Sequence, residues 1–396
     1  MSDEPIVRIA ARGDGITADG RHAPQSAPGD LLGIDGTLTH GPHHVDPPCR
    51  HYPACGGCQL QHVDDESFSQ FLVDRIVGAL NGQKLDAPPI RPVHISPPFA
   101  RRRVSLRAER KGRRVTIGFN EEQSHTIVDL KQCDVMAPEL FALLAPLRIL
   151  LLQLLKDKRA GNVQMTLADQ GVDLLLDKVE ADDLAAVEAL TDFAQAHRLA
   201  RLSLDTGNGA EARWEPLPVT ITLGGVAVPL PVSAFLQATA DGEAKLVATV
   251  REIVGDAAQV VDLFAGLGTF ALALDARVLA VEGARDAALA LKAGAGRVQR
   301  MLVVELRDLS RRPLTRVELG RFDAVVLDPP RAGAREQMVE LAAADVARIA
   351  YVSCNPATFA RDARTLTDAG WRLEWIQPVG QFRWSTHAEL VGSFSR

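Results

Sequence analysis

The chain has 396 residues, of which 46% are hydrophobic and 24% are charged, and its formal net charge at pH 7 is −6. This composition is typical of a globular protein of two or three domains, and it argues against a protein that binds nucleic acid by electrostatics alone. No apolar run reaches the roughly 18 residues of a membrane helix, and the N-terminus lacks the apolar stretch of a secretory signal, so we expect a cytoplasmic protein with no membrane partner.

Residues 1–47 are rich in Gly, Asp and Pro and contain short apolar pieces such as Ile6–Ile9. This pattern predicts small strands joined by turns, as in a compact β-barrel of the OB type. A flexible N-terminal arm fits the same composition almost as well. We take this segment as a first, small domain.

Residues 48–234 form the expected second domain, of mixed α+β character. Apolar periodicity predicts strands at 162–167 and 172–177, and it predicts helices over Glu66–Leu80, 137–158 and 180–198. The stretch 201–234 is expected to form further strands. No internal repeat is visible.

The most basic part of this domain is residues 101–114, which contain eight Lys or Arg residues and one acid. Val104, Leu106 and Ala108 alternate there with polar residues, and Lys111–Gly112 supplies a turn. This arrangement predicts a β-hairpin with one basic face. Such a face either contacts phosphate groups or is a merely solvated charged surface.

Five cysteines are present, an odd number that favours metal binding or catalysis over disulfides in a cytosolic protein. Four of them form one predicted metal-binding set, in which Gly56 and Gly57 let the backbone fold tightly. Four thiolates suit either zinc or an iron–sulfur cluster. The members of the set are Cys49, Cys55, Cys58 and Cys133.

From residue 235 to residue 396, apolar strands alternate with Ala-rich helical segments. This alternation predicts βα units, a parallel sheet and hence an α/β domain. The predicted strands are Gln259–Phe264, Arg277–Glu282, Met301–Glu305, Phe322–Leu327 and Arg348–Ser353.

The first of these strands runs into a turn containing Gly266 and Gly268, which is followed by a predicted helix. Glycines let the backbone pass close to a ligand, and this turn falls at the carboxyl edge of the sheet. The spacing also fits a dinucleotide site, as in a nicotinamide-dependent dehydrogenase. Asp262 favours the cationic methionine end of S-adenosylmethionine instead, and Glu282 is placed to bind both ribose hydroxyls.

A second strand ends in Asp328-Pro-Pro-Arg331, in which two prolines fix a rigid turn beside the predicted cofactor site. Methyltransferases that act on amino groups carry an aromatic residue after the two prolines, so Arg331 argues against a nitrogen target. A third strand ends in Cys354-Asn-Pro, which places a thiol at the same edge. A dehydrogenase leaves both of these features unexplained.

A thiol is needed when the methyl acceptor is carbon 5 of uracil, which is too weak a nucleophile by itself. A thiolate that adds to carbon 6 makes carbon 5 nucleophilic, and a base must later remove the carbon 5 proton. His387 and Glu389 both lie in the C-terminal stretch, and we favour Glu389 because it opens the final apolar strand. The uridine has to be flipped out or unpaired to reach the thiol, which favours RNA loops and single strands.

Together these residues resemble the RNA uridine-C5 methyltransferase family, in particular its iron–sulfur branch that acts on 23S ribosomal RNA. The resemblance covers essentially the whole chain. The motifs that carry it are CRHYPACGGCQLQH (49–62), DLFAGLGTF (262–270), LDPPR (327–331), YVSCNPATFARD (351–362) and THAELV (386–391).

The resemblance implies a Rossmann-like class I methyltransferase domain, Cys354 as the nucleophile, Glu389 as the base and Asp328 between cofactor and substrate. It also implies an RNA-binding N-terminal barrel and a [4Fe-4S] cluster on the four cysteines, with a structural or RNA-contacting role. We expect a monomer. The implied contacts to S-adenosylmethionine are Gln237, Phe264, Gly266, Gly268, Thr269, Glu282, Asp308 and Asp328.

The chain departs from the family pattern at Thr269 and Thr239, where the family usually has Asn, so the Thr269 contact is in question. Two alternatives stay open at this point. The transfer-RNA branch of the same family lacks the cluster cysteines. A non-catalytic iron–sulfur RNA-binding protein would not need the pair Cys354 and Glu389.

Overall fold

The computed structural model describes residues 3–298 and 301–396, which fold into two compact units. Unit 1 contains the described residues up to 68 together with 97–220 and 383–386, and unit 2 contains 69–96, 221–382 and 387–396. Neither unit is one continuous stretch of chain. The three consecutive domains 1–47, 48–234 and 235–396 therefore stay a prediction.

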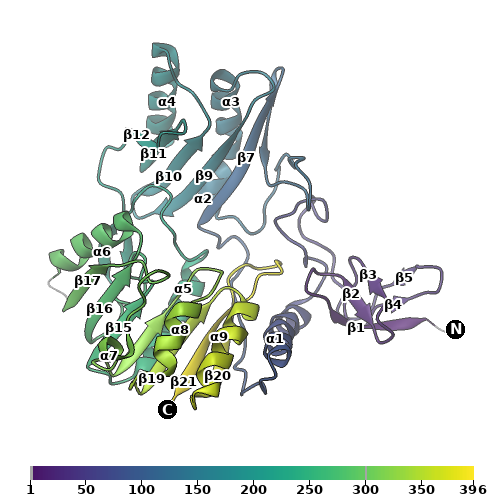
Figure 1. Ribbon diagram of the computed structural model, residues 1–396. Coiled ribbons are helices and arrows are strands. Elements are labelled where there is room, and N and C mark those ends of the chain that lie inside the picture. Colours follow the sequence, from purple (N-terminus) through teal and green to yellow (C-terminus); the bar gives the residue numbers. More distant parts are fainter. Residues whose placement is uncertain (1–2, 299–300) are drawn as a thin grey trace. The chain divides into compact units, whose positions relative to one another are not determined.

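Unit 1 begins with a small five-stranded antiparallel sheet (Figure 1, purple). Its order is β3-β2-β1-β4-β5, and Ile6, Ala23 and Leu32 form its core. This curled sheet confirms the predicted small strands of the N-terminal segment. The strands are β1 (Glu4–Ile9), β2 (Gly15–Thr17), β3 (His22–Ala23), β4 (Leu31–Leu32) and β5 (Leu38–Thr39).

The larger sheet of unit 1 has the order β12-β11-β10-β9-β7-β8. The predicted helix 137–158 is divided into α2 (Pro138–Ala142) and α3 (Leu144–Leu154), and α4 (Leu184–Ala196) starts at an Asp183 cap. All three helices pack on this sheet around one core. The strands are β7 (Arg103–Lys111), β8 (Arg114–Gly118), β9 (Ala160–Ala168), β10 (Gly171–Asp177), β11 (Arg201–Asp205) and β12 (Ala210–Trp214).

Strands β7 and β8 form the predicted hairpin, but several of its basic side chains already have partners within the protein. The Arg110 guanidinium donates to the carbonyls of Leu152 (2.7 Å) and Leu155 (2.8 Å) at the end of α3. Arg114 forms a 2.9 Å ion pair with Asp129. These arginines contribute to the fold, so only part of the predicted basic face is available to a ligand.

Unit 2 is built on an eight-stranded sheet of order β17-β16-β15-β18-β19-β21-β20-β6. The five predicted strands are confirmed as its parallel part, and β21 inserts antiparallel to both β19 and β20. A separate pair, β13 (Thr220–Leu223) and β14 (Val226–Pro229), precedes it in the chain. The strands are β6 (His94–Ile95), β15 (Gln259–Leu263), β16 (Arg277–Glu282), β17 (Leu302–Leu306), β18 (Ala324–Leu327), β19 (Arg348–Ser353), β20 (Arg372–Gly380) and β21 (Glu389–Ser395).

Helices cover this sheet. The long helix α1 continues from unit 1, and its residues Ile76 and Leu80 share a core with Met338 of α8 and Phe359 of α9. Helix α5 packs against β18, β19 and β21, and α6 packs against β16 and β17 (Figure 1). The helices are α1 (Asp65–Gly82), α5 (Ala240–Val254), α6 (Arg285–Arg297), α7 (Arg316–Leu319), α8 (Arg335–Ala342) and α9 (Pro356–Asp368).

The helix predicted directly after the glycine turn is wrong, because residues 264–273 form a series of turns. The Asp262 carboxylate accepts the Ala271 N–H at 2.9 Å and so removes that donor from a helical ladder. Phe264, Gly266 and Gly268 also adopt positive φ angles of 62°, 55° and 91°, which do not belong to an α-helix.

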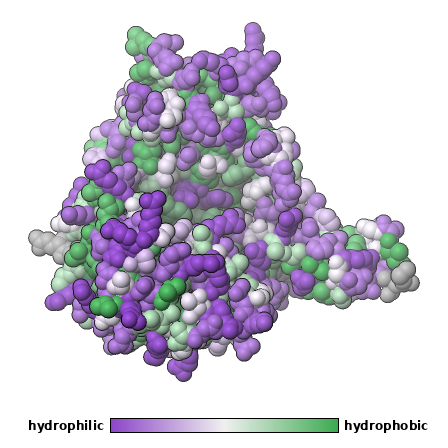
Figure 2. Space-filling model, in the orientation of Figure 1, coloured by the Kyte–Doolittle hydropathy of each residue, from purple (hydrophilic) through white to green (hydrophobic). Residues whose placement is uncertain are grey.

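Within the described part of the chain, no helix is both long and apolar enough to span a membrane. The face in Figure 2 is mainly hydrophilic, with hydrophobic residues exposed in scattered places. This surface agrees with the composition of the sequence.

Candidate active site

The candidate site lies where the strand order of unit 2 reverses. From β15 the chain first adds β16 and β17 on one side, and it then crosses to β18 and β19 on the other. In sheets of this kind, ligands bind at the carboxyl ends of the strands beside such a reversal. The glycine turn follows β15 and Asp328 follows β18, so both lie at this position.

The glycine turn is held open toward ligands by two acidic side chains. Glu282 accepts the Gly266 N–H at 2.8 Å and the Ala284 N–H at 2.6 Å, which ties the end of β16 to the turn. A Cβ atom on Gly266 would meet nothing within 4 Å, so this part of the backbone borders open space. Each Glu282 oxygen keeps a second lone pair with which it can accept a ligand hydroxyl.

Asp262 is fully buried beneath this turn. One of its oxygens binds Ala271, and Oδ1 has no hydrogen-bond partner among the described residues. Burial raises the pKa of Asp262 well above its ordinary value, and the nearby carboxylates of Asp328 and Glu282 raise it further. An unsatisfied buried acceptor of this kind is costly, and a cationic ligand group beside the turn would compensate for it.

Asp328 ends β18 and is fixed by a chain of amide side chains. The Gln237 Nε2 atom donates to Asp328 Oδ2 at 3.2 Å, and Gln381 Nε2 donates to Gln237 Oε1 at 2.7 Å. Gln381 in turn accepts the Ala238 N–H at 2.8 Å. Burial raises the pKa of the Asp328 carboxyl to about 7, although the Gln237 hydrogen bond lowers it. Gln381 was not found from the sequence, because a single Gln after an apolar strand carries no motif.

The loops after β18 and β19 are bound to each other. The Arg331 carbonyl accepts hydrogen bonds from Asn355 Nδ2 at 3.1 Å and from the Thr358 hydroxyl at 3.2 Å. Asn355 also caps α9, because its side chain accepts the Ala357 N–H at 3.1 Å. The Asp-Pro-Pro-Arg and Cys-Asn-Pro motifs therefore form one rigid edge.

Cys354 lies opposite Glu389 at this edge. Ser353, the last residue of β19, pairs with Leu390 of β21 in antiparallel register, so Cys354 and Glu389 are the residues that come directly after this last pair. Cys354 is half-buried and Glu389 is 5% exposed. Burial raises the pKa of the Cys354 thiol, and the charges of Glu389 and Asp328 raise it further. The three groups therefore affect one another electrostatically. The raised pKa keeps the Cys354 thiol protonated in the free protein.

The remaining predicted cofactor residues surround the glycine turn. Phe264 and Thr269 are half-buried parts of it. Asp308 follows β17, and its Cα would lie 3.6 Å from a Cβ atom on Gly283, beside the end of β16. Its side chain is exposed and forms a 3.5 Å ion pair with Arg311. His387, the rejected alternative to Glu389, is exposed and contacts Phe382.

The four cysteines Cys49, Cys55, Cys58 and Cys133 lie in unit 1, where they line one pocket. Burial raises the pKa of each of these thiols, that of Cys58 to about 12, and the four influence one another. The sequence gap of 74 residues between Cys58 and Cys133 is thus closed by the fold.

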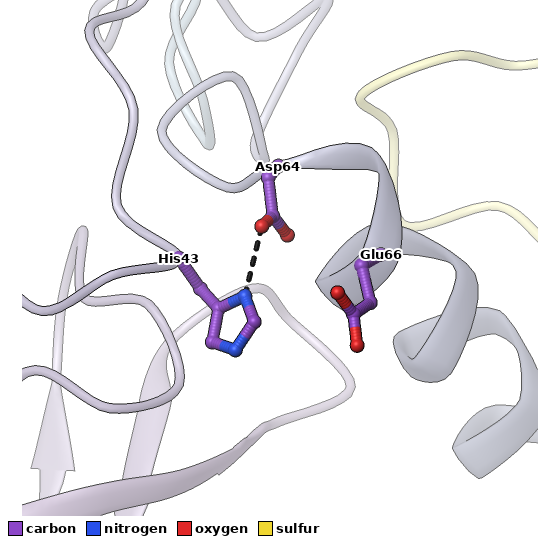
Figure 3. A group of neighbouring side chains, drawn as sticks. All are labelled: His43, Asp64 and Glu66. Atoms are coloured by element: carbon purple, nitrogen blue, oxygen red, sulfur yellow. Dashed lines mark hydrogen bonds and ion pairs between the residues drawn. The ribbon is translucent and has the colours of Figure 1, made fainter.

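A second group of potential ligands consists of His43, Asp64 and Glu66 (Figure 3). Its ligand atoms lie within 4.8 Å of one another, the only such group in the described ranges. The Asp64 oxygens are already engaged, because they accept the His43 ring at 2.8 Å and the Ser67 N–H at 2.8 Å in the first turn of α1. We interpret this group as a helix cap.

The chain is similar to known RNA methyltransferases. The family model described as tRNA (Uracil-5-)-methyltransferase matches residues 230–394. An RNA methyltransferase of Zymomonas mobilis is 52% identical over 99% of both chains. The 23S rRNA (uracil(1939)-C(5))-methyltransferase of Pectobacterium atrosepticum is 31% identical over 90% of this chain and 81% of that protein.

Among solved structures, the Pyrococcus abyssi tRNA (uracil-54, C5)-methyltransferase in complex with S-adenosyl-L-homocysteine has a similar fold. The TM-score is 0.78 at 21% sequence identity, and the match covers 99% of both chains. This similarity shows a class I methyltransferase fold.

The raised pKa of Asp328 predicts how stability depends on pH. An unfolded Asp ionises near pH 4, so between about pH 4 and 7 the folded protein binds more protons and loses stability as the pH rises. We expect Asp328→Asn to stabilise the ligand-free protein above pH 7, by roughly 1–4 kcal/mol, and to have little effect below pH 4. Urea denaturation across this pH range measures the difference. An equal effect at all pH values would show that the carboxyl ionises normally.

Proposed function

The chain belongs to the uracil-C5 family of S-adenosylmethionine-dependent RNA methyltransferases, and from this membership we propose that it methylates carbon 5 of a uridine in 23S ribosomal RNA. The observation that carries this proposal is the position of Cys354 opposite Glu389, beside Asp328. A nucleophile and a base that lie at the same end of two neighbouring strands can act on adjacent carbons of a single ring.

The cofactor site fits S-adenosylmethionine better than a dinucleotide. A dinucleotide places its pyrophosphate on the N-terminus of a helix that follows the glycine turn, and residues 264–273 contain no such helix. Acidic side chains surround the turn instead, and the buried Asp262 Oδ1 suits a cation. We propose Gln237, Phe264, Gly266, Gly268, Thr269, Glu282, Asp308 and Asp328 as the residues that hold this co-substrate, which supplies the methyl group.

The reaction begins when the Cys354 sulfur bonds to carbon 6 of the uracil and the displaced electron pair makes carbon 5 nucleophilic. The thiol has to lose its proton first, and its raised pKa opposes this loss in the free protein. Asp328, whose pKa is about 7, is an acceptor that can take a proton near neutral pH. Transfer of the thiol proton from Cys354 to Asp328 would therefore take place once the uridine is bound.

Glu389 acts after carbon 5 has taken the methyl group. It removes the proton from carbon 5, and the electron pair of that bond then expels the Cys354 thiolate from carbon 6. The side chain is buried at the start of β21, where a rigid strand fixes its position. Without this base the methylated adduct would persist.

The choice of 23S ribosomal RNA rests on the named Pectobacterium relative and on the cysteine set. Transfer RNA is the second candidate, because the matching family model is described by that substrate. Basic side chains of the β7–β8 hairpin would contact the RNA backbone. Action on ribosomal RNA would take place in the cytoplasm, and we expect the enzyme to act as a monomer.

We further propose that the four cysteines hold a [4Fe-4S] cluster. Four thiols converge on one buried pocket, which fits a cluster bound by four thiolates. A zinc ion with bonds of about 2.3 Å would draw its sulfurs within about 4 Å of one another. In the described residues no three cysteine sulfurs come within 4.8 Å of one another. Methyl transfer involves no net oxidation or reduction, so the role of the cluster would be structural.

The first prediction of the proposed function concerns the nucleophile and the substrate. With 5-fluorouridine-substituted 23S ribosomal RNA, the protein should form an adduct that survives denaturants, because fluorine cannot be removed from carbon 5 as a proton can. Cys354→Ala should abolish the adduct, and gel electrophoresis detects it. His387→Gln, which changes an exposed residue near the proposed base, serves as the control and should still form the adduct. An adduct with transfer RNA and none with ribosomal RNA would show that transfer RNA, the second candidate, is the substrate.

The second prediction concerns the base. Glu389→Gln should form the methylated adduct with unmodified RNA but release it poorly, so that kcat falls about 100-fold or more while adduct accumulates. His387→Gln, an exposed neighbour, should turn over normally. Rapid quenching and mass spectrometry of the adduct measure both. Normal turnover of the Glu389 variant would remove this residue from the mechanism.

The third prediction concerns the metal. Protein purified without oxygen should contain about four iron and four sulfide ions per chain. Cys58→Ser should lower both, whereas Cys354→Ser should leave both unchanged because that thiol lies in unit 2. Elemental analysis and an assay for acid-labile sulfide test this. Zinc without sulfide would contradict the cluster.

A further inference from the structure

The short segment 383–386 connects β20 to β21, yet it folds with unit 1 rather than with the strands on either side of it. Glu389 follows it after only two intervening residues. Both Ala388 and Leu390 next to the base are buried. Glu389 is therefore the first residue of β21 and is joined by a short stretch of chain to a segment that folds with unit 1.

Trp384 fixes this segment to the cysteine loop. Its side chain is 7% exposed and packs with Cys58, Val135 and Cys133. Its carbonyl accepts the N–H groups of Gln59 at 2.8 Å and Leu60 at 2.9 Å, directly after Cys58. Two backbone hydrogen bonds and a buried ring thus join the segment to the residues that follow one proposed cluster ligand.

The backbone at Trp384 is also strained, with a φ angle of 60°. A bulky residue rarely adopts this left-handed conformation, which persists only where surrounding contacts enforce it. The neighbouring Arg383 forms a 2.5 Å ion pair with Asp65, which is largely exposed. The Arg383 guanidinium also lies 4.8 Å from the centre of the Trp384 ring, so this arginine is a second attachment of the segment beside Trp384.

We propose that Trp384 is a positioning residue that couples the cysteine loop to the base Glu389. This inference rests on the proposed function and adds a role for the loop: its order holds the base in place for proton removal from carbon 5. Five peptide bonds separate the two residues, and a chain this short transmits a displacement of Trp384 to Glu389. The loop would thereby affect release of the product without contacting the uridine or transferring an electron.

A double-mutant cycle tests this coupling. Trp384→Gly removes the ring but tolerates the positive φ angle, and it should lower kcat roughly 10- to 100-fold while KM for RNA is unchanged. The adduct with 5-fluorouridine RNA should still form at the normal rate, because that step precedes the base. Trp384→Phe should restore most of kcat. In a Glu389→Gln background, Trp384→Gly should cause no further loss.

The outcomes separate this inference from the proposed function. If Glu389→Gln has no effect, the assignment of the base fails. If it lowers kcat and Trp384→Gly multiplies the loss in the double variant, Trp384 acts through another group and the coupling is overturned. The coupling is equally overturned if Trp384→Gly slows formation of the 5-fluorouridine adduct as much as it slows turnover.

Hydrogen exchange gives a second test that does not depend on activity or on the stability of the Trp384 variants. Removal of metal from the full-length protein by a chelator should speed exchange in peptides covering 385–390. Peptides covering β19 (Arg348–Ser353) should be unaffected and serve as the internal control. Unchanged exchange at 385–390 would overturn the coupling.

Discussion

The antiparallel pairing of β21 between β19 and β20 is the constraint on which the site depends. The other strands near the site are parallel, and their carboxyl ends deliver only the groups that follow each strand. An antiparallel insertion brings the beginning of a strand to the same edge, which places Glu389 across from Cys354. Side chains alternate along a strand, so a slip of one residue would turn Glu389 to the other face of the sheet. Residues 389–394 of β21 are all buried, so packing on both faces of the sheet holds the strand in its register.

The same edge collects buried carboxyl groups at a cost in stability. Asp262 and Asp328 both have raised pKa values because burial disfavours their charged forms, and Glu282 stands beside them. Groups of like charge are not collected in this way for the sake of folding alone. A cationic co-substrate would relieve this repulsion, and binding would then stabilise the protein. The amide chain from Gln381 through Gln237 keeps Asp328 in one orientation until that ligand arrives.

Most of the sheet, and the positions of Cys354 and Glu389 at one of its edges, could be predicted from the sequence, because both depend on local patterns. Apolar runs marked the strands, and Cys354 and Glu389 each stood at a strand end. The turns after Gly268 could not be predicted, since they depend on Asp262 taking the Ala271 N–H. The internal partners of Arg110 and Arg114 also lay outside the reach of pattern analysis, because α3 and Asp129 approach the hairpin only in the folded chain. Trp384 belongs to no sequence motif. Its attachment to the cysteine loop is seen only from the hydrogen bonds that its carbonyl accepts from Gln59 and Leu60.

The discontinuous path of the chain has a consequence for how the protein is made. The N-terminal part of unit 1 leaves the ribosome well before residues 383–386 of the same unit. Cys58 and Cys133 are therefore synthesised before Trp384, which packs against them in the folded chain. During this interval the cysteine loop lacks the contacts that Trp384 makes with it in the folded chain. Unit 1 can therefore complete its packing around these cysteines only after residues 383–386 have been synthesised.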